Sequence, residues 1–253
     1  MSHCLKRLWA APVIAAAITV ATAGTAVALA ITGTDGHDRI LGSRAADTID
    51  AKGGPDFVRA LAGNDAITLG EGFDRARAGD GDDVVDGGLG TDVIHAGRGA
   101  DAVDSGEGSD RVFGGLGADR LTLGVGDDRV IAGDGDDVVD AGPGFDRVRG
   151  RPGNDTESGG EGFDTMFGGL GSDSISGGPG NDRLFARATD GAPDTVSGDE
   201  GDDRIHVRDG TRDVVTCGAG IDRVRADLQD AVSADCERVR RHAPRPGYIN
   251  RSE

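Results

Sequence analysis

An apolar residue recurs every nine positions along most of the chain. From residue 33 to residue 185 the sequence divides into seventeen consecutive nonapeptides without insertion or deletion, and the eighth position is apolar in all but one of them. Successive side chains of a strand point to opposite faces, so positions seven to nine predict a three-residue strand with one buried side chain. A chain of such units predicts an all-β repeat fold whose core is a thin ladder of Val, Ile and Leu.

Glycines fill the spaces between these strands. The fourth position of the repeat is Gly in sixteen units, Ala45 being the exception, and the second position is usually Gly as well. Glycine reaches the positive φ angles that a tight turn needs. A turn plus a strand in nine residues is half of an 18-residue coil, so odd and even repeats should form two parallel sheets that face each other. The fold class expected is a parallel β-roll, a two-sheet β-solenoid of 18-residue coils.

The sixth position of the repeat is Asp in every unit. These residues are Asp38, Asp47, Asp56, Asp65, Asp74, Asp83, Asp92, Asp101, Asp110, Asp119, Asp128, Asp137, Asp146, Asp155, Asp164, Asp173 and Asp182. The pattern continues imperfectly to about residue 225, through Asp194, Asp203, Asp213 and Asp222. The seventeen regular aspartates together with Asp203 are the candidate metal ligands.

The amino-acid composition limits what this chain can bind. The 253 residues include 45 Gly, and 45 acidic residues outnumber 27 basic ones, for a formal net charge of -18. A uniformly acidic chain repels nucleic acid and anionic membranes, so neither is an expected partner. Such a chain either stays unfolded or neutralises its carboxylates, and the obvious neutraliser is a hard cation that prefers oxygen ligands.

The unit Gly-Gly-x-Gly-x-Asp-x-apolar-x resembles the RTX, or haemolysin-type, calcium-binding repeat. The resemblance implies that multiple Ca²⁺ ions bind through Asp carboxylates and turn carbonyls, each ion between one turn and the next, and that the coil folds as they bind. Non-glycine residues in some turns imply weaker or missing ions there, namely Ser43, Arg44, Ala45, Lys52, Leu61 and Arg151. The toxin, protease or lipase activities found in that family are not carried over.

The two ends of the chain depart from the repeat. Lys6 and Arg7 precede an uncharged run that ends at Ala30, which predicts a signal peptide over residues 1–30 and a secreted protein, with an uncleaved N-terminal anchor as the alternative. Cys4 lies in this segment. Cys217 and Cys236 predict a disulfide in an oxidising compartment. We expect the roll over residues 31–225, irregular from 186, then a cap at 226–241 and a disordered tail at 242–253.

The outward positions seven and nine differ between odd and even repeats. Odd repeats carry Arg39, Arg59, Arg75, Arg77, Arg111, Arg129, Arg147, Arg149 and Arg183 together with Phe57, Phe113, Phe167 and Phe185. Even repeats carry Arg120 and otherwise Asp50, Asp86, Asp104, Asp140, Thr48, Thr68, Thr122, Thr156, Ser158 and Ser174. The arginines keep the strand face charged and soluble in one interpretation. In the other, the Arg/Phe face docks an anionic cell-wall or extracellular polymer.

Glu157 is the one charged residue at a buried eighth position. A carboxylate in so thin a core is costly unless paired, so we expect a local distortion that turns Glu157 outward or brings Arg149 or Arg151 to it.

No enzyme signature stands out. The sequence contains neither His-Glu-x-x-His nor Gly-x-Ser-x-Gly. Paired acids such as Asp127 and Asp128 could serve as acid and base, but the repetition of Asp at the sixth position of every turn favours calcium ligation. The expectation is therefore a calcium-binding, structural or cell-surface adhesive module that is not an enzyme; the alternative is a polysaccharide-active β-solenoid enzyme.

Overall fold

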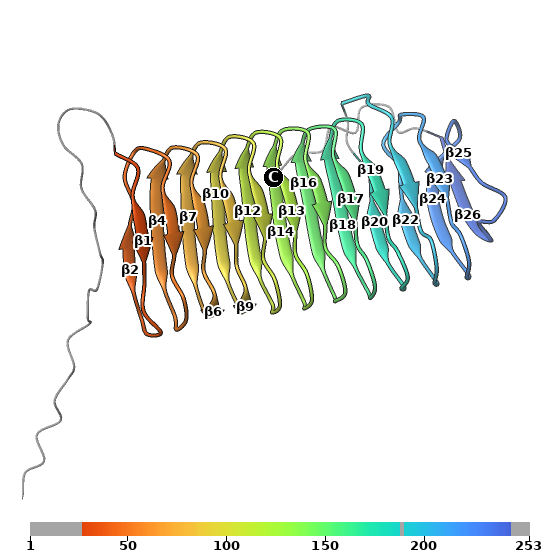
Figure 1. The fold of residues 1–253 in the computed structure, drawn as a ribbon. Coiled ribbons are helices and arrows are strands. Elements are labelled where there is room, and N and C mark those ends of the chain that lie inside the picture. Colours follow the sequence, from red (N-terminus) through yellow and green to blue (C-terminus); the bar gives the residue numbers. More distant parts are fainter. Residues whose placement is uncertain (1–26, 188–189, 244–253) are drawn as a thin grey trace, which may run out of the picture.

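In the computed structural model, which describes residues 27–187 and 190–243, the strands stack into one elongated parallel solenoid (Figure 1). Sheet A contains β1 (Ala30–Thr32), β3 (Thr48–Asp50), β5 (Ala66–Thr68), β8 (Val84–Asp86), β11 (Ala102–Asp104), β13 (Arg120–Thr122), β15 (Val138–Asp140), β17 (Thr156–Ser158), β19 (Ser174–Ser176), β21 (Thr195–Ser197), β23 (Val214–Thr216) and β25 (Ala231–Val232), in that order. Sheet B contains β2 (Arg39–Leu41), β4 (Phe57–Ala62), β7 (Arg75–Asp80), β10 (Val93–Arg98), β12 (Arg111–Leu116), β14 (Arg129–Asp134), β16 (Arg147–Pro152), β18 (Thr165–Leu170), β20 (Arg183–Phe185), β22 (Arg204–His206), β24 (Arg223–Asp227) and β26 (Arg238–His242). A short pair, β6 (Glu71–Gly72) and β9 (Leu89–Gly90), lies in the turns.

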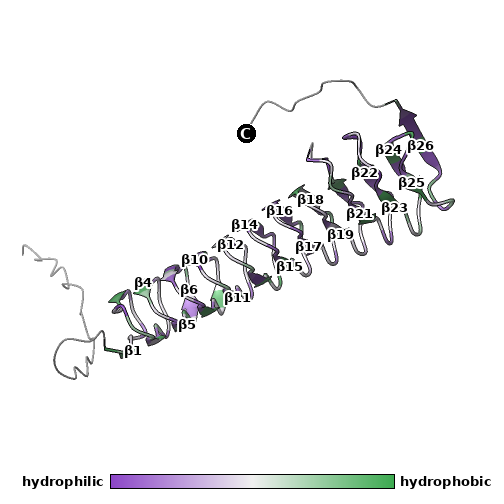
Figure 2. Cartoon of the chain, turned by 90° about the horizontal axis from the view of Figure 1, so that it is seen from above, coloured by the Kyte–Doolittle hydropathy of each residue, from purple (hydrophilic) through white to green (hydrophobic). Residues whose placement is uncertain are grey.

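The register confirms the parallel β-roll. Each strand pairs in parallel with the strand one coil away, and in the regular run the partners are 18 residues apart, as in Ile49 with Ile67. The two sheets form opposite sides of the coil, one from the even repeats and one from the odd (Figure 2). At the irregular intervals the offset becomes 21 residues between Ile175 and Val196, then 19 between Val196 and Val215. The extra residues therefore enlarge turns and leave the sheets in register.

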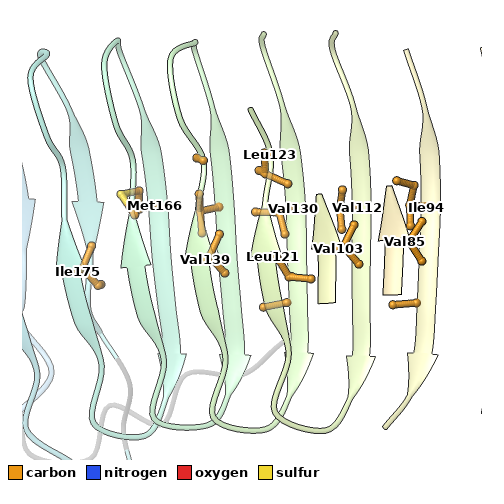
Figure 3. Packing of buried hydrophobic residues seen from close by; sticks show 14 of the residues in the cluster. Val85, Ile94, Val103, Val112, Leu121, Leu123, Val130, Val139, Met166 and Ile175 are labelled. Carbon is orange, nitrogen blue, oxygen red and sulfur yellow. The ribbon is translucent and has the colours of Figure 1, made fainter. Parts of the chain in front are cut away.

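The core is the ladder of eighth-position side chains that the repeat predicts (Figure 3), with one addition. The first position of many repeats is also buried, by small or aliphatic residues such as Ala60, Leu69 and Leu123. Seven strands of sheet B continue past position nine into the next repeat. Each of them is six residues long and has two buried positions, one at position eight and one at position one of the next repeat, as in β12. The expected three-residue strand with one buried side chain is therefore wrong for that stretch of sheet B, because its backbone stays extended beyond position nine.

The turns show why glycine is required. A Cβ built at Gly108, where φ is +152°, would overlap the carbonyl oxygen of Gly90 in the neighbouring coil. Lys52, Leu61 and Arg151 stand where the repeat has its second glycine, and they take the same left-handed backbone with φ of 81°, 95° and 90°. Side chains with a Cβ are strained in that region. The stack therefore imposes its turn geometry on residues that do not favour it.

The ends are described in part. Residues 1–26 of the expected signal peptide and 244–253 of the expected tail lie outside the described residues. Leu29 packs against the core, and its carbonyl oxygen accepts the Thr48 N–H at 2.8 Å. Strand β26 runs to His242, one residue into the segment expected to be disordered.

Cys217 and Cys236 form the predicted disulfide, with a Cα–Cα distance of 5.2 Å. Among the described residues, no helix is long and apolar enough to cross a bilayer.

Glu157 corrects the sequence-based expectation. Its side chain points inward with 1% exposure, and neither carboxyl oxygen has a hydrogen-bond partner. Strand β17 stays in register with both neighbours, which place Val139 and Ile175 beside it. Gly150 makes room, because a Cβ there would lie 2.8 Å from Oε1 of Glu157. The register fixes the direction of position eight, so the carboxyl group is buried, and burial raises its pKa well above the usual value.

We expect the substitution Glu157→Val to stabilise the calcium-bound protein. It removes a buried polar group without a partner, whose cost in proteins is about 1–3 kcal/mol, and it restores the apolar ladder. Thermal unfolding followed by circular dichroism should give a higher Tm for Glu157→Val and a smaller rise for Glu157→Gln. The exposed Glu161→Gln is the control and should leave the Tm unchanged. A Tm for Glu157→Val at or below that of the wild type would contradict this account.

Candidate metal centres

The sixth-position aspartates form two buried rows, one along each edge of the solenoid. Odd repeats supply one row and even repeats the other, and every predicted ligand from Asp38 to Asp203 is 5% exposed or less. Each residue directly precedes a strand, so the parallel register places it beside its equivalent in the next coil. The structure thus brings together all eighteen predicted ligands, and Asp194, Asp213 and Asp222 continue the rows.

Each row is held by one repeated hydrogen bond. The backbone N–H of one aspartate donates to Oδ1 of the aspartate in the next coil, as from Asp110 to Asp128 at 2.7 Å and from Asp128 to Asp146 at 2.8 Å. The other carboxylate oxygen, Oδ2, is buried without a hydrogen-bond partner in every member from Asp56 to Asp222. A buried carboxylate oxygen without a donor is costly, so each of these positions lacks a partner that a cation would supply.

In the first two turns of the regular run, the second carboxylate oxygen of the aspartate has a hydrogen-bond donor. Oδ2 of Asp38 accepts the N–H of Thr34 at 2.6 Å, and Oδ2 of Asp47 accepts the N–H of Ser43 at 2.6 Å. Local donors therefore satisfy the oxygen that is without a partner elsewhere. The turns of Lys52, Leu61 and Arg151, which also depart from the repeat, lack such a donor, because Oδ2 of their aspartates has no partner. Weaker or missing ions at the departing turns stay a prediction.

The electrostatics of the rows favour a bound positive charge. Burial, together with the repulsion of neighbouring carboxylates, raises the pKa of Asp146 to about 8 and that of Asp83 to about 7. The N–H bond to Oδ1 opposes this shift without cancelling it. Either protons or cations must compensate carboxylates in such an environment.

The donors in these rows suit Ca²⁺. The glycine turns stack so closely that the carbonyl oxygen of one lies against the backbone of the next, as for Gly90 and Gly108. Carboxylate and carbonyl oxygens therefore occur together at each step of the stack, and oxygen donors are what Ca²⁺ takes. The adjacent acids Asp127 and Asp128 do not face one site, since the first is exposed and the second buried.

One ligand candidate was missed by the sequence reasoning. Carboxylate oxygens of Asp194, Asp209 and Asp213 lie within 4.8 Å of one another, and Oδ2 of each is buried without a partner. Asp209 occupies the second position of its irregular turn, where the regular repeat has glycine. The segment Asp209-Gly-Thr-Arg-Asp213 could have predicted this ligand, because a carboxylate four residues before a sixth-position Asp lies in the same turn. Three carboxylates here give a site of higher ligand charge than two stacked aspartates.

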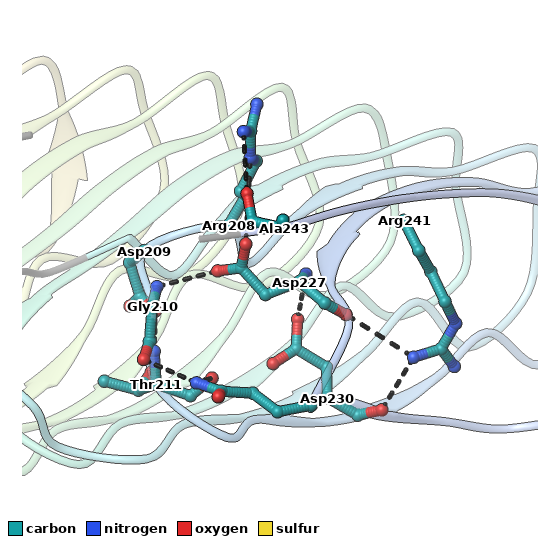
Figure 4. Close-up of polar contacts among 9 residues, drawn as sticks. Arg208, Asp209, Gly210, Thr211, Asp227, Asp230, Arg241 and Ala243 are labelled. Carbon is teal, nitrogen blue, oxygen red and sulfur yellow. Dashed lines mark hydrogen bonds and ion pairs between the residues drawn. The ribbon is translucent and has the colours of Figure 1, made fainter. Parts of the chain in front are cut away.

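The C-terminal coil holds that turn in place (Figure 4). Oδ2 of Asp227 accepts the N–H of Gly210 at 2.7 Å, and Oδ1 of Asp227 pairs with Arg208 at 3.7 Å. Asp230 accepts the Asp227 N–H at 2.5 Å, while Arg241 donates to the carbonyl oxygen of Asp230 at 2.9 Å. The predicted cap segment therefore fixes the backbone of the turn that carries Asp209.

Comparison with known proteins agrees with this geometry. The family model of the RTX calcium-binding nonapeptide repeat, in four copies, matches overlapping segments that together cover residues 32–224. Among curated proteins, no match was found. The matched segments contain both aspartate rows and all the regular turns. The chain belongs to the RTX calcium-binding nonapeptide repeat family, as a calcium-binding β-roll protein.

Proposed function

We propose that this protein is a secreted structural or cell-surface adhesive module whose β-roll folds when it binds multiple Ca²⁺ ions. The observation that carries the proposal is the pair of aspartate rows whose Oδ2 atoms are buried without hydrogen-bond partners. The disulfide between Cys217 and Cys236 supports secretion, since such bonds persist in oxidising compartments.

The folding switch follows from the size of the core. The apolar ladder is one or two side chains wide in each half-coil, so it offsets little of the conformational entropy lost on folding. Without cations the like charges of each row repel as well. Ions that bind the folded turns, and bind the unfolded chain weakly, stabilise the fold by mass action. The adhesive part of the proposal rests on the face of sheet B, where arginines lie over aromatic rings, as Arg39 does over Phe57 at 5.3 Å.

We expect circular dichroism to show β-structure in millimolar Ca²⁺ and an unfolded spectrum in excess EDTA. In a calcium titration, Asp128→Asn should shift the folding midpoint several-fold to higher calcium, because it removes a buried carboxylate from the row. Its chain neighbour makes a matched control: Asp127→Asn removes an exposed charge and should leave the midpoint within about twofold, the scale of a surface electrostatic effect.

Equally β-rich spectra with and without EDTA would overturn the folding switch. Equal midpoints for the Asp128→Asn and Asp127→Asn variants would show that the buried rows are not the ligands.

The pKa values predict opposite effects of acid with and without calcium. Burial raises the pKa of Asp146 to about 8 and that of Asp56 to about 6 in the folded metal-free chain. A raised pKa stabilises the fold at low pH, and this stabilisation is lost as pH rises through about 6 to 8. In EDTA, β-structure should therefore increase from pH 8 to pH 5.

In calcium, protons compete for the same carboxylates, so the midpoint should move to higher Ca²⁺ over the same pH range. Circular dichroism in both series checks this pair of effects. A calcium midpoint that does not change with pH would contradict it.

A further inference from the structure

The last three strands of sheet B carry two adjoining columns of cationic side chains. In the first column Arg204 of β22 pairs in register with Arg223 of β24, which pairs with Arg238 of β26. In the second column His206 is followed by Arg225 and then Arg240. We call the five arginines the C-terminal arginine cluster. They lie at the C-terminal end of the solenoid in Figure 2, where β22, β24 and β26 are labelled.

The cluster surrounds a hollow in the face of the sheet. The five arginines and the neutral His206, with Val224 and Val239 between the columns, line a pocket of about 590 Å³. All five arginines are exposed, and His206 is half-buried. Neighbouring strands are about 4.8 Å apart, so each column presents guanidinium groups at that interval along the solenoid.

In the described part of the chain, no ion pair involves these arginines. The two ion pairs found among residues 27–187 and 190–243 are Lys52 with Asp50 and Arg208 with Asp227, and neither involves the cluster. Like charges directly opposite one another on paired strands are destabilising. Burial, together with the charges of Arg225 and Arg187, lowers the pKa of His206 to about 4. The arginines thus stack in register without a direct ion pair to an acidic residue, although Asp182 and Asp202 lie near Arg204 and Arg223.

The middle of the same face lacks this arrangement. Arg111, Arg129 and Arg147 also stack in register, but the positions two residues later are Phe113, Ile131 and Arg149. The arginines there form a single column, and the neighbouring column is largely apolar. The double column therefore distinguishes the C-terminal end of sheet B from its middle. The single column in the middle is the matched control for a binding test.

We propose that the C-terminal arginine cluster binds a carboxylated polysaccharide. This rests on the proposed adhesive function and assigns the contact to one end of sheet B. Guanidinium groups bind carboxylates with two parallel hydrogen bonds, and an extended polymer with carboxylates along its length can engage arginines of more than one strand. The net charge of -18 disfavours the more densely charged nucleic acids, which carry one charge per about 1.7 Å of duplex.

The test measures binding of the full chain, in calcium, to immobilised hyaluronan, with neutral dextran and a double-stranded DNA fragment as comparison surfaces. We expect binding to hyaluronan that weakens with salt and exceeds binding to either comparison surface. The triple variant R204Q/R223Q/R238Q should lose at least tenfold in affinity. The control variant R111Q/R129Q/R147Q removes the same charge from the same column position of sheet B and should lose less than about twofold, as expected for a charge outside the contact.

Equal losses in the two triple variants would overturn the assignment to this end of the sheet. No binding of the wild type to hyaluronan, or equal or tighter binding to DNA, would overturn the choice of ligand. Circular dichroism of every variant in calcium keeps the two proposals apart. A folded protein that does not bind refutes the polysaccharide site alone, whereas a protein that is equally folded in EDTA refutes the calcium switch.

Discussion

The repulsion between stacked carboxylates is the constraint on which the rest of this molecule depends. A solenoid with identical turns places every sixth-position aspartate beside another of its kind, and the backbone N–H groups satisfy one oxygen of each, as between Asp110 and Asp128. The second oxygen is left buried and without a donor. The narrow core offsets little of the cost of two such rows, so the carboxylates must be compensated by protons or by cations.

Much of this was predictable because the repeat is regular. A fixed period of nine determines the register, the register determines which side chains stack, and the invariant Asp determines where the oxygens gather. The direction of Glu157 was not predictable by the same reasoning. Its charge suggested that it would turn outward, whereas the backbone register of β17 keeps it inward, and Gly150 supplies the space. The longer strands of sheet B were also missed, because small residues such as Ala60 at position one gave no strong strand signal.

The irregular turns contain a candidate ligand that the regular repeat pattern did not predict. The three carboxylates of Asp194, Asp209 and Asp213 arise because an interval of ten residues replaces one of nine and an Asp replaces a glycine. The same irregular end carries the disulfide, the hydrogen bonds around Asp227 and the arginine cluster of β22, β24 and β26. Several departures from the repeat thus lie at the end of the roll that carries the arginine cluster, as others do in its first turns.

A crystal structure of the protein grown in calcium, with anomalous scattering to locate the ions, tests the central claim most directly. The account predicts an ion at the Oδ2 atoms along both rows, for example at Asp110 and Asp128, with calcium–oxygen distances of about 2.3–2.6 Å. It would be contradicted by a folded coil in which these Oδ2 atoms contact no ion and the carboxyl groups are instead protonated and hydrogen-bonded to one another.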